Sequence, residues 1–166
     1  EGGLSFINIP VCAKASGLMN TITSTMYTPN ALILNPANIW NASPIVLSYT
    51  QRQKNPYQLS YNTTFLTRRL KTRNNVVLGL GFINYGVNKI EAYDINANFI
   101  EYFNWNDRCV LTGLSVRSLG LLMGVGVNYI FRSTSIDPGY KESYMGLNVG
   151  VTLENIRPPK NVVTTL

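Results

Sequence analysis

Apolar residues recur at every second position in three stretches of the chain, residues 76–84, 121–129 and 145–153. Successive side chains of a β-strand point to opposite faces, so this period of two predicts strands with one wholly apolar face. In the last stretch the apolar face consists of Met145, Leu147, Val149, Val151 and Leu153. The other face carries glycine, asparagine, threonine and tyrosine, whereas a soluble sheet usually presents charged residues to water. The pattern is typical of a membrane β-barrel, whose apolar face points outward to lipid.

Six segments have this strand-like character. We expect them at roughly 45–53, 57–66, 75–85, 107–117, 120–131 and 142–153, with a seventh at about 21–27. Several approach the roughly 9 to 11 residues that cross a bilayer at a tilt. The connection at 117–120 is tight, whereas 86–105 and 133–141 are predicted as long loops. Outer-membrane barrels place short turns in the periplasm and long loops outside. The turn at 117–120 is therefore expected in the periplasm, and because connections alternate between the two sides, the basic turn at 67–74 is expected there too.

A set of outward positions in these predicted strands carries no charge. They are Ile45, Leu47 and Tyr49; Tyr57, Leu59 and Tyr61; Val76, Leu78, Leu80 and Phe82; Val110, Thr112, Leu114 and Val116; Leu121, Met123, Val125 and Val127; and Met145, Leu147, Val149, Val151 and Leu153. A Lys or Arg at the bilayer midplane would cost roughly 2–4 kcal/mol, so we expect these positions to face outer-membrane lipid. Aromatic residues near the strand ends are expected to form girdles at the membrane interfaces. These aromatic residues are Tyr57, Tyr85, Phe103, Trp105, Tyr129 and Phe131.

Residues 1–40 lack the strand rhythm and contain short helix-like turns, the last interrupted by Pro36. Glycines occupy many inward positions of the predicted strands, where they would let another segment approach closely. These glycines are Gly79, Gly81, Gly113, Gly124, Gly126, Gly146 and Gly150. We therefore expect residues 1–40 to form an N-terminal plug segment inside a barrel built from residues 41–166.

Composition narrows the class of protein. Apolar residues make up 45% of the chain and charged residues only 13%, against about 25% in a typical soluble domain. No apolar run reaches the roughly 20 residues of a membrane helix, which excludes a helical membrane protein. The chain opens with Glu1, Gly2 and Gly3, with neither an initiator methionine nor a leader. We expect a processed product or an internal fragment.

The net charge of +6 includes a cluster of Arg68, Arg69, Lys71 and Arg73. Aromatic residues do not interleave with this cluster as they do in proteins that bind single-stranded nucleic acid, so nucleic acid is not expected as a partner. The cluster is interpreted either as a contact for an acidic periplasmic partner or as a solvated turn.

Candidate chemistry is sparse. The chain has no histidine, and no Ser, Thr or Cys lies beside a plausible base, so we expect no catalytic residue, no cofactor and no metal. Residues 94–98 begin like a calcium loop, but Phe99 stands where glycine is required, which favours a hairpin loop. Cys12 and Cys109 are interpreted as small buried residues or as the partners of a single disulfide bridge.

The element Asn35-Pro36-Ala37, just before the first clear strand, resembles that of the FadL-like outer-membrane β-barrel superfamily. The segments 6–10 and 82–86 are similar to the PorQ- and PorV-like members associated with the type IX secretion system of Bacteroidetes. The resemblance implies a non-enzymatic barrel in the bacterial outer membrane that anchors a type IX secretion or cell-surface attachment complex. Its partners would be cell-surface or secretion-complex proteins. An alternative implied by the same superfamily is a FadL-type channel for hydrophobic small molecules.

The number of strands falls short of a complete barrel. Barrels of this family are longer, and bacterial single-chain barrels have an even number of strands. An open sheet edge cannot face lipid, because its unpaired backbone groups would cost several kcal/mol each. We therefore predict an all-β, antiparallel transmembrane β-barrel of which this chain is the N-terminal half, with the remaining strands supplied by the same or another chain.

Overall fold

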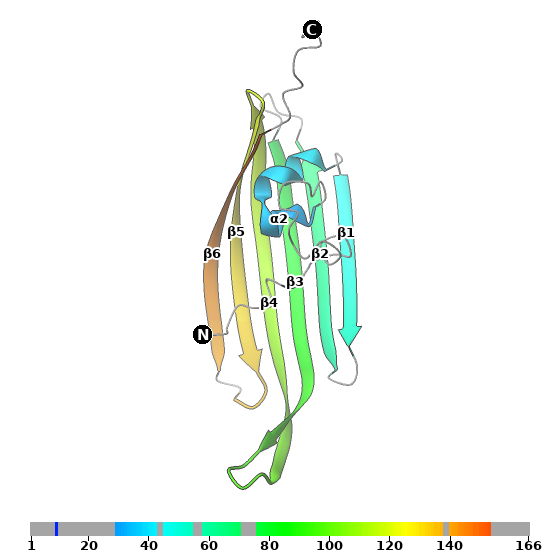
Figure 1. Cartoon of the computed structure of the whole chain (residues 1–166), viewed down its shortest axis with the longest axis vertical. Helices are drawn as coiled ribbons and strands as arrows, with labels where there is room; N and C mark the ends of the chain where they lie inside the picture. Colours follow the sequence, from blue (N-terminus) through cyan, green and yellow to red (C-terminus); the bar gives the residue numbers. More distant parts are fainter. Residues whose placement is uncertain are drawn as a thin grey trace, which may run out of the picture.

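The computed structural model describes residues 9, 29–42, 45–54, 58–70, 76–137 and 140–153. These residues form mostly β-structure, in one antiparallel sheet of six strands that is not closed into a barrel (Figure 1). The strands are β1 (Ile45–Lys54), β2 (Leu59–Arg69), β3 (Val76–Tyr93), β4 (Phe99–Ser118), β5 (Leu121–Thr134) and β6 (Lys141–Leu153). The predicted antiparallel β-sheet is confirmed for this part of the chain, which is mostly β rather than all-β. The predicted strand at 21–27 lies outside the described residues.

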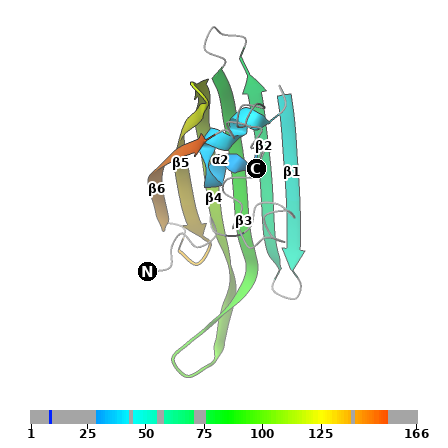
Figure 2. The ribbon, with the colours of Figure 1, turned by 45° about the horizontal axis from the view of Figure 1, so that its top comes forward.

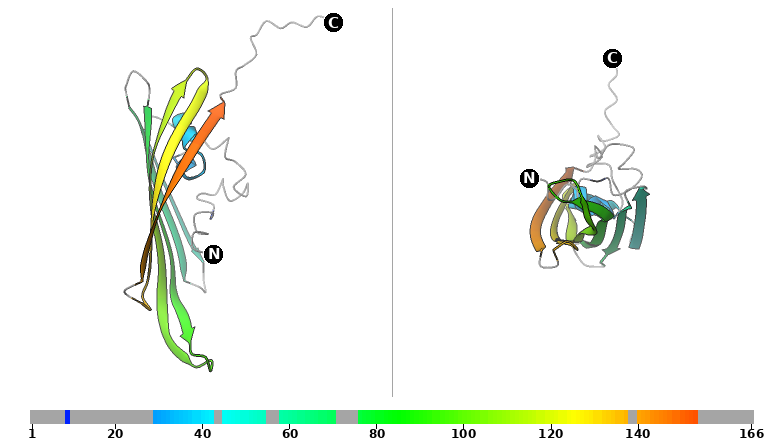
Figure 3. Two further views of the ribbon diagram at one scale, coloured as in Figure 1. Left: turned by 90° about the vertical axis from the view of Figure 1, so that its left-hand side faces the viewer. Right: turned by 90° about the horizontal axis from the view of Figure 1, so that it is seen from below.

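The sheet is a simple meander in which each strand pairs with the next one along the chain, in the order β1 to β6. It curves around two short helical elements, α2 (Ala31–Leu34) and the 3₁₀ helix η2 (Pro36–Asn41), as the view from below in Figure 3 shows. Both elements lie near the end of the sheet at which β1 begins (Figure 1). The sheet therefore has an inner face, which holds the helical elements, and an outer face.

Strands β3 and β4 are much longer than predicted, because the expected loop at 86–105 is mostly strand. The pairing of β3 with β4 is irregular between Val87 and Ile90, where Lys89 has a φ of +53°. The side-chain oxygen of Asn104 accepts the Lys89 backbone N–H at 3.0 Å and so satisfies the irregular backbone. A bulge of this kind adds a residue and breaks the period of two, which is why the sequence pattern ended too early.

The resulting hairpin extends beyond the other strands and ends in a tight turn at 94–98 (Figure 2). Oδ1 of Asp94 accepts the backbone N–H groups of Asn96 and Asn98, each at 2.8 Å. Its Oδ2 accepts the Asn98 side-chain amide at 3.0 Å. Tyr93 and Phe99 meet edge to face across the hairpin, with 6.1 Å between ring centroids. The predicted hairpin loop at 94–98 is confirmed.

The predicted outward face of β2 is wrong. Tyr61 is only 1% exposed and lies on the inner face, where its ring meets Tyr85 edge to face at 6.5 Å. Leu59 packs against the same buried cluster, and Tyr57 lies outside the described residues. The outer face of β2 instead carries Ser60, Asn62, Thr64, Leu66 and Arg68. A period of two tells which residues share a face but not which face is inside.

The helical elements are short. In the described part of the chain, no helix is long and apolar enough to span a membrane.

Candidate functional site

The outer face of the sheet carries most of the exposed large apolar side chains of the described chain. Strand register arranges its residues in transverse rows, each crossing the sheet from β1 to β6. The first row is Ile45, Arg68, Leu78, Leu114, Val125 and Val149; the second is Leu47, Leu66, Leu80, Thr112, Val127 and Leu147; and the third is Tyr49, Thr64, Phe82, Val110, Tyr129 and Met145. Further apolar residues continue beyond the first row, and we call the whole surface the apolar belt. These further residues are Val76, Val116, Met123 and Val151, then Leu121 and Leu153.

Every residue predicted to face lipid in β3, β5 and β6 lies in this belt. The set is Val76, Leu78, Leu80, Phe82, Leu121, Met123, Val125, Val127, Met145, Leu147, Val149, Val151 and Leu153. Many of these side chains are strongly exposed; Val149 is 72% exposed on the edge strand, and Leu80 is 53% exposed within the sheet. Nothing among the described residues covers the belt. On β2 the belt is narrow, because Leu66 is the only apolar residue between Thr64 and Arg68.

The belt ends sharply beyond its third row. The next row is Gln51, Asn62, Asn84, Arg108, Phe131 and Ser143, in which polar residues dominate. Tyr129 and Phe131 meet edge to face at this border, with 4.4 Å between ring centroids. Two other aromatic residues predicted for the girdle are placed differently: Tyr85 packs against the inner core and Trp105 contacts the buried Arg132. The predicted girdle is therefore wrong for Tyr85 and Trp105.

The belt has about the height expected of a membrane-facing band. From Met145 to Leu153 the chain advances eight residue steps along β6. At roughly 3.3 Å per residue this is about 26 Å along the strand. The apolar band of an outer-membrane barrel is about 25 Å tall, and its strands are tilted, which shortens the projected height.

The inner face is complementary to the helical elements. The Cβ that a larger residue would add at Gly79 would lie 3.1 Å from Cδ1 of Ile39. At Gly124 an added Cβ would overlap the backbone of Pro36 and Ala37. Gly79 and Gly124, two of the inward glycines predicted from the sequence, therefore do permit the close approach of another segment. Around this contact a buried apolar cluster joins the helical elements to the sheet. Its largest members include Leu32, Ile39, Phe65, Leu111 and Leu122.

Polar groups hold the predicted plug element against β4 and β6. The side-chain oxygen of Asn35 accepts the Ala37 backbone N–H at 3.1 Å and so caps η2, while its amide donates to Thr152 Oγ1 at 3.1 Å. Thr152 Oγ1 donates to Asn38 Oδ1 at 2.7 Å. The hydroxyl of Ser115 donates to the carbonyl oxygen of Ala37 at 2.8 Å. Asn35, Pro36 and Ala37 thus lie on the inner face.

Sequence reasoning missed these polar partners on the wall. Ser115 and Thr152 stand at inward positions of β4 and β6, where small polar residues alternate with the apolar belt. The alternation of these residues with the outward apolar ones was the available signal. A hydroxyl at an inward position could equally bind water in an open bore.

The basic cluster predicted as a partner contact is split between the two faces. Arg68 points to the outer face, whereas Arg69 turns inward. The Arg69 guanidinium donates to the carbonyl oxygen of Trp40 at 2.6 Å and lies 4.8 Å from the centre of its indole ring. Lys71 and Arg73 lie outside the described residues. Of the four residues, Arg69 is therefore engaged by the helical elements.

A buried ion pair lies on the inner face toward the long hairpin. Arg132 binds the Asp107 carboxylate through two parallel bonds, Nε to Oδ1 at 2.8 Å and a terminal nitrogen to Oδ2 at 3.1 Å. The Arg132 guanidinium also lies 4.9 Å from the centre of the Trp105 ring and 3.8 Å from Glu142. Such paired and stacked charges orient side chains within a wall. No local sequence pattern predicts this pair.

The described residues contain no group of three or more His, Cys, Asp or Glu side chains placed to hold a metal ion. Cys109 is buried on the inner face. Its predicted bridge involves Cys12, which lies outside the described residues. Comparisons with family models, with curated protein sequences and with solved structures found no match for this chain. The chemistry of the two sheet faces is therefore the basis for a functional proposal.

Proposed function

We propose that this chain forms part of the wall of a bacterial outer-membrane β-barrel and serves as a non-enzymatic anchor in a secretion or cell-surface attachment complex. One observation carries the proposal: the sheet is exposed and apolar on its outer face, while α2 and η2 pack on its inner face. A soluble sheet packs its apolar face inside, so this reversal favours lipid outside.

The extent of the belt supports a membrane rather than a protein partner. It crosses all six strands and ends at a polar row with Tyr129 and Phe131 at the border. The largest apolar patch on a typical soluble monomer is only about 300–600 Å². An uncovered surface of this width is stable where hydrocarbon replaces water.

The sheet edges support a larger barrel. Among the described residues, β1 and β6 each pair with a strand on one side only. Unpaired backbone groups in hydrocarbon would cost several kcal/mol each. We therefore propose that further strands, from the same or another chain, pair with β1 and β6 and close the wall.

A filled bore favours an anchor over a channel. The helical elements are bound to the inner wall by buried apolar contacts and by bonds from Ser115 and Thr152. The resemblance of Asn35-Pro36-Ala37 to the PorQ- and PorV-like proteins implies the anchor role, in which extracellular loops bind surface or secretion proteins. A FadL-type channel would instead need the helical elements to move aside.

The two roles are separated by purifying the native complex from membranes in a mild detergent. A large surface or secretion protein in stoichiometric amount would support the anchor. Fatty acid or other lipid recovered from the bore, without a protein partner, would support the channel. Recovery of the protein in the aqueous fraction without detergent would contradict both.

A further inference from the structure

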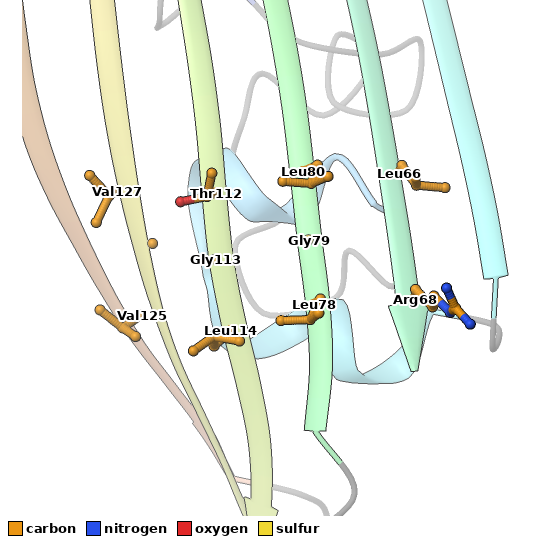
Figure 4. A pocket seen from close by; sticks show the side chains of 11 residues that line it. Leu66, Arg68, Leu78, Gly79, Leu80, Thr112, Gly113, Leu114, Val125 and Val127 are labelled. Carbon is orange, nitrogen blue, oxygen red and sulfur yellow. The ribbon is translucent and has the colours of Figure 1, made fainter. Parts of the chain in front are cut away.

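A shallow groove of about 510 Å³ crosses the apolar belt between its first and second rows (Figure 4). Its floor is formed by Gly79, Gly113 and Gly126, which are direct register neighbours on β3, β4 and β5. Leu78 and Leu114 of the first row stand along one side. The other side is formed by four residues of the second row, Leu66, Leu80, Thr112 and Val127. Its size falls in the range of small-molecule sites, about 300–1,000 Å³.

The groove suits a long apolar ligand. It crosses β2 to β5, three interstrand spacings of about 4.8 Å each, and so runs for about 14 Å. Apart from Arg68 at one end, Thr112 carries the only polar side chain that lines it. A polar ligand would therefore find almost no hydrogen-bond partner along the groove, whereas a hydrocarbon chain would lose nothing on entering it.

One end of the groove carries a positive charge. Arg68 is the only charged residue in the first three rows of the belt, and its side chain is exposed. Within the described residues it forms no ion pair, in contrast to Arg69, which is bound to Trp40. Arg68 lies one residue before the end of β2, beside Ile45 at the start of β1, so the belt ends at Arg68 on these two strands, whereas on β6 it continues from Val149 to Leu153. A guanidinium there can snorkel to the membrane interface and bind a phosphate with two parallel bonds.

We infer that this groove and Arg68 form a binding site for one anionic glycerophospholipid of the surrounding bilayer. One acyl chain lies in the groove over Gly79 and Gly113, and the phosphate binds the Arg68 guanidinium. The inference rests on the proposed function, since the groove lies on the face assigned to lipid. It goes beyond that function by assigning one tightly held lipid and a headgroup charge to a specific place on the wall.

The test uses the full-length protein reconstituted in nanodiscs of either phosphatidylglycerol or phosphatidylcholine and measured by native mass spectrometry. The wild type is expected to retain one phosphatidylglycerol. Arg68→Gln should reduce that retention about tenfold or more, because a charge-assisted contact is lost. Thr112→Trp should reduce it equally by filling the groove while the charge remains. Arg108→Gln, a second outward arginine in the polar row, and Val151→Trp, which adds bulk outside the groove, are the controls and should retain the lipid.

Several outcomes would overturn the inference. Equal retention by Arg68→Gln and wild type would exclude the phosphate contact. Equal retention of phosphatidylcholine and phosphatidylglycerol would exclude selection by charge, and retention by Thr112→Trp would exclude the groove. Failure of the wild-type protein to enter nanodiscs would contradict the proposed function itself, whereas insertion without a retained lipid would contradict this inference alone.

Discussion

Gly124 on β5 limits how closely η2 approaches the sheet, whereas Gly146 on β6 does not lie against the helical elements. Gly124 lies against the backbone of Pro36 and Ala37, which cannot rotate away as a flexible side chain could. Gly146 also lies on the inner face, but on β6. A Cβ added there would have only ordinary contacts, the nearest being the Asn128 side-chain amide nitrogen at 3.6 Å. The two positions therefore look alike in sequence but differ in what a methyl group would meet.

Gly124→Ala is expected to displace η2 from the wall, at a cost of about 1–3 kcal/mol from overpacking. Trp40, which is 5% exposed, should then become exposed to a more polar environment. In a Trp105→Phe background, Trp40 fluorescence would shift to longer wavelength and its quenching by iodide would increase. Gly146→Ala is the matched control and should leave both unchanged. Unchanged fluorescence in Gly124→Ala would show that η2 does not contact β5.

A second prediction concerns the pair of Asp107 and Arg132. Their side chains are 4% and 7% exposed, so Asp107→Asn leaves the buried Arg132 with only the more distant Glu142, 3.8 Å away, as a counter-ion. The expected loss is about 3 kcal/mol of unfolding free energy in urea titrations of the detergent-solubilised protein. Replacing both residues by leucine should cost less than the single change, because no charge then remains buried. Wild-type stability of Asp107→Asn would contradict the buried placement of the pair.

At the scale of elements, the β3–β4 hairpin depends on one carboxylate at its tip. Hydrogen bonds from the side chain and then the backbone N–H of Asn98, with a further bond from Asn96, hold the pKa of Asp94 below its usual range. Because the folded-state pKa is lowered, the turn is stabilised at pH values above the ordinary carboxyl range. That stabilisation is lost as the pH falls through the folded-state pKa.

Acidification should therefore open the tip of the hairpin while the rest of the sheet stays folded. Amide hydrogen exchange at Asn96 and Asn98 is the measurement, with acceleration expected, relative to the intrinsic rate, only at acidic pH. Asp94→Asn should give fast exchange already at neutral pH and little further dependence on pH. A pH-independent protection in the wild type would argue against the role of the carboxylate.

The same elements show how far sequence patterns reach. β1 and β6 begin and end within one residue of prediction. In β6 a period of two from Met145 to Leu153 marks the strand, whereas β1 is marked by its β-branched and apolar start rather than by alternation. The predictions for β3 and β4 are too short, since the irregular pairing at Lys89 and the aromatic pairs beyond it have no period of two. A tyrosine suits either a membrane interface or an inner face that offers its hydroxyl a partner. The sequence alone therefore does not specify the face of Tyr61 on β2.

The contact of the helical elements was predictable only in part. Inward glycines and the Asn35-Pro36-Ala37 element indicated that something would pack inside, and both lie in that contact. Which polar wall residues bind it depends on a register between segments more than a hundred residues apart, such as Asn35 and Thr152. A local pattern does not specify such a register.

For the whole molecule, the proposal requires that the belt tolerate no charge at its centre. Val149→Arg is expected to impair insertion into lipid vesicles, since an arginine near the midplane costs roughly 2–4 kcal/mol. Ser143→Arg is the matched control, on the same strand and the same face but in the polar row, and should insert normally. Vesicle flotation measures both. Equal flotation of the two variants would contradict the assignment of the outer face.

The most direct measurement is quenching of single tryptophans by phospholipids with brominated acyl chains. In the full-length protein with Trp40 and Trp105 replaced by phenylalanine, a tryptophan is placed at Val149 or at Ser143 and the protein is reconstituted in brominated and ordinary vesicles. Strong quenching at position 149 and weak quenching at position 143 are the result we expect. Absence of quenching at position 149, with its fluorescence insensitive to the lipid, would show that hydrocarbon does not cover the outer face.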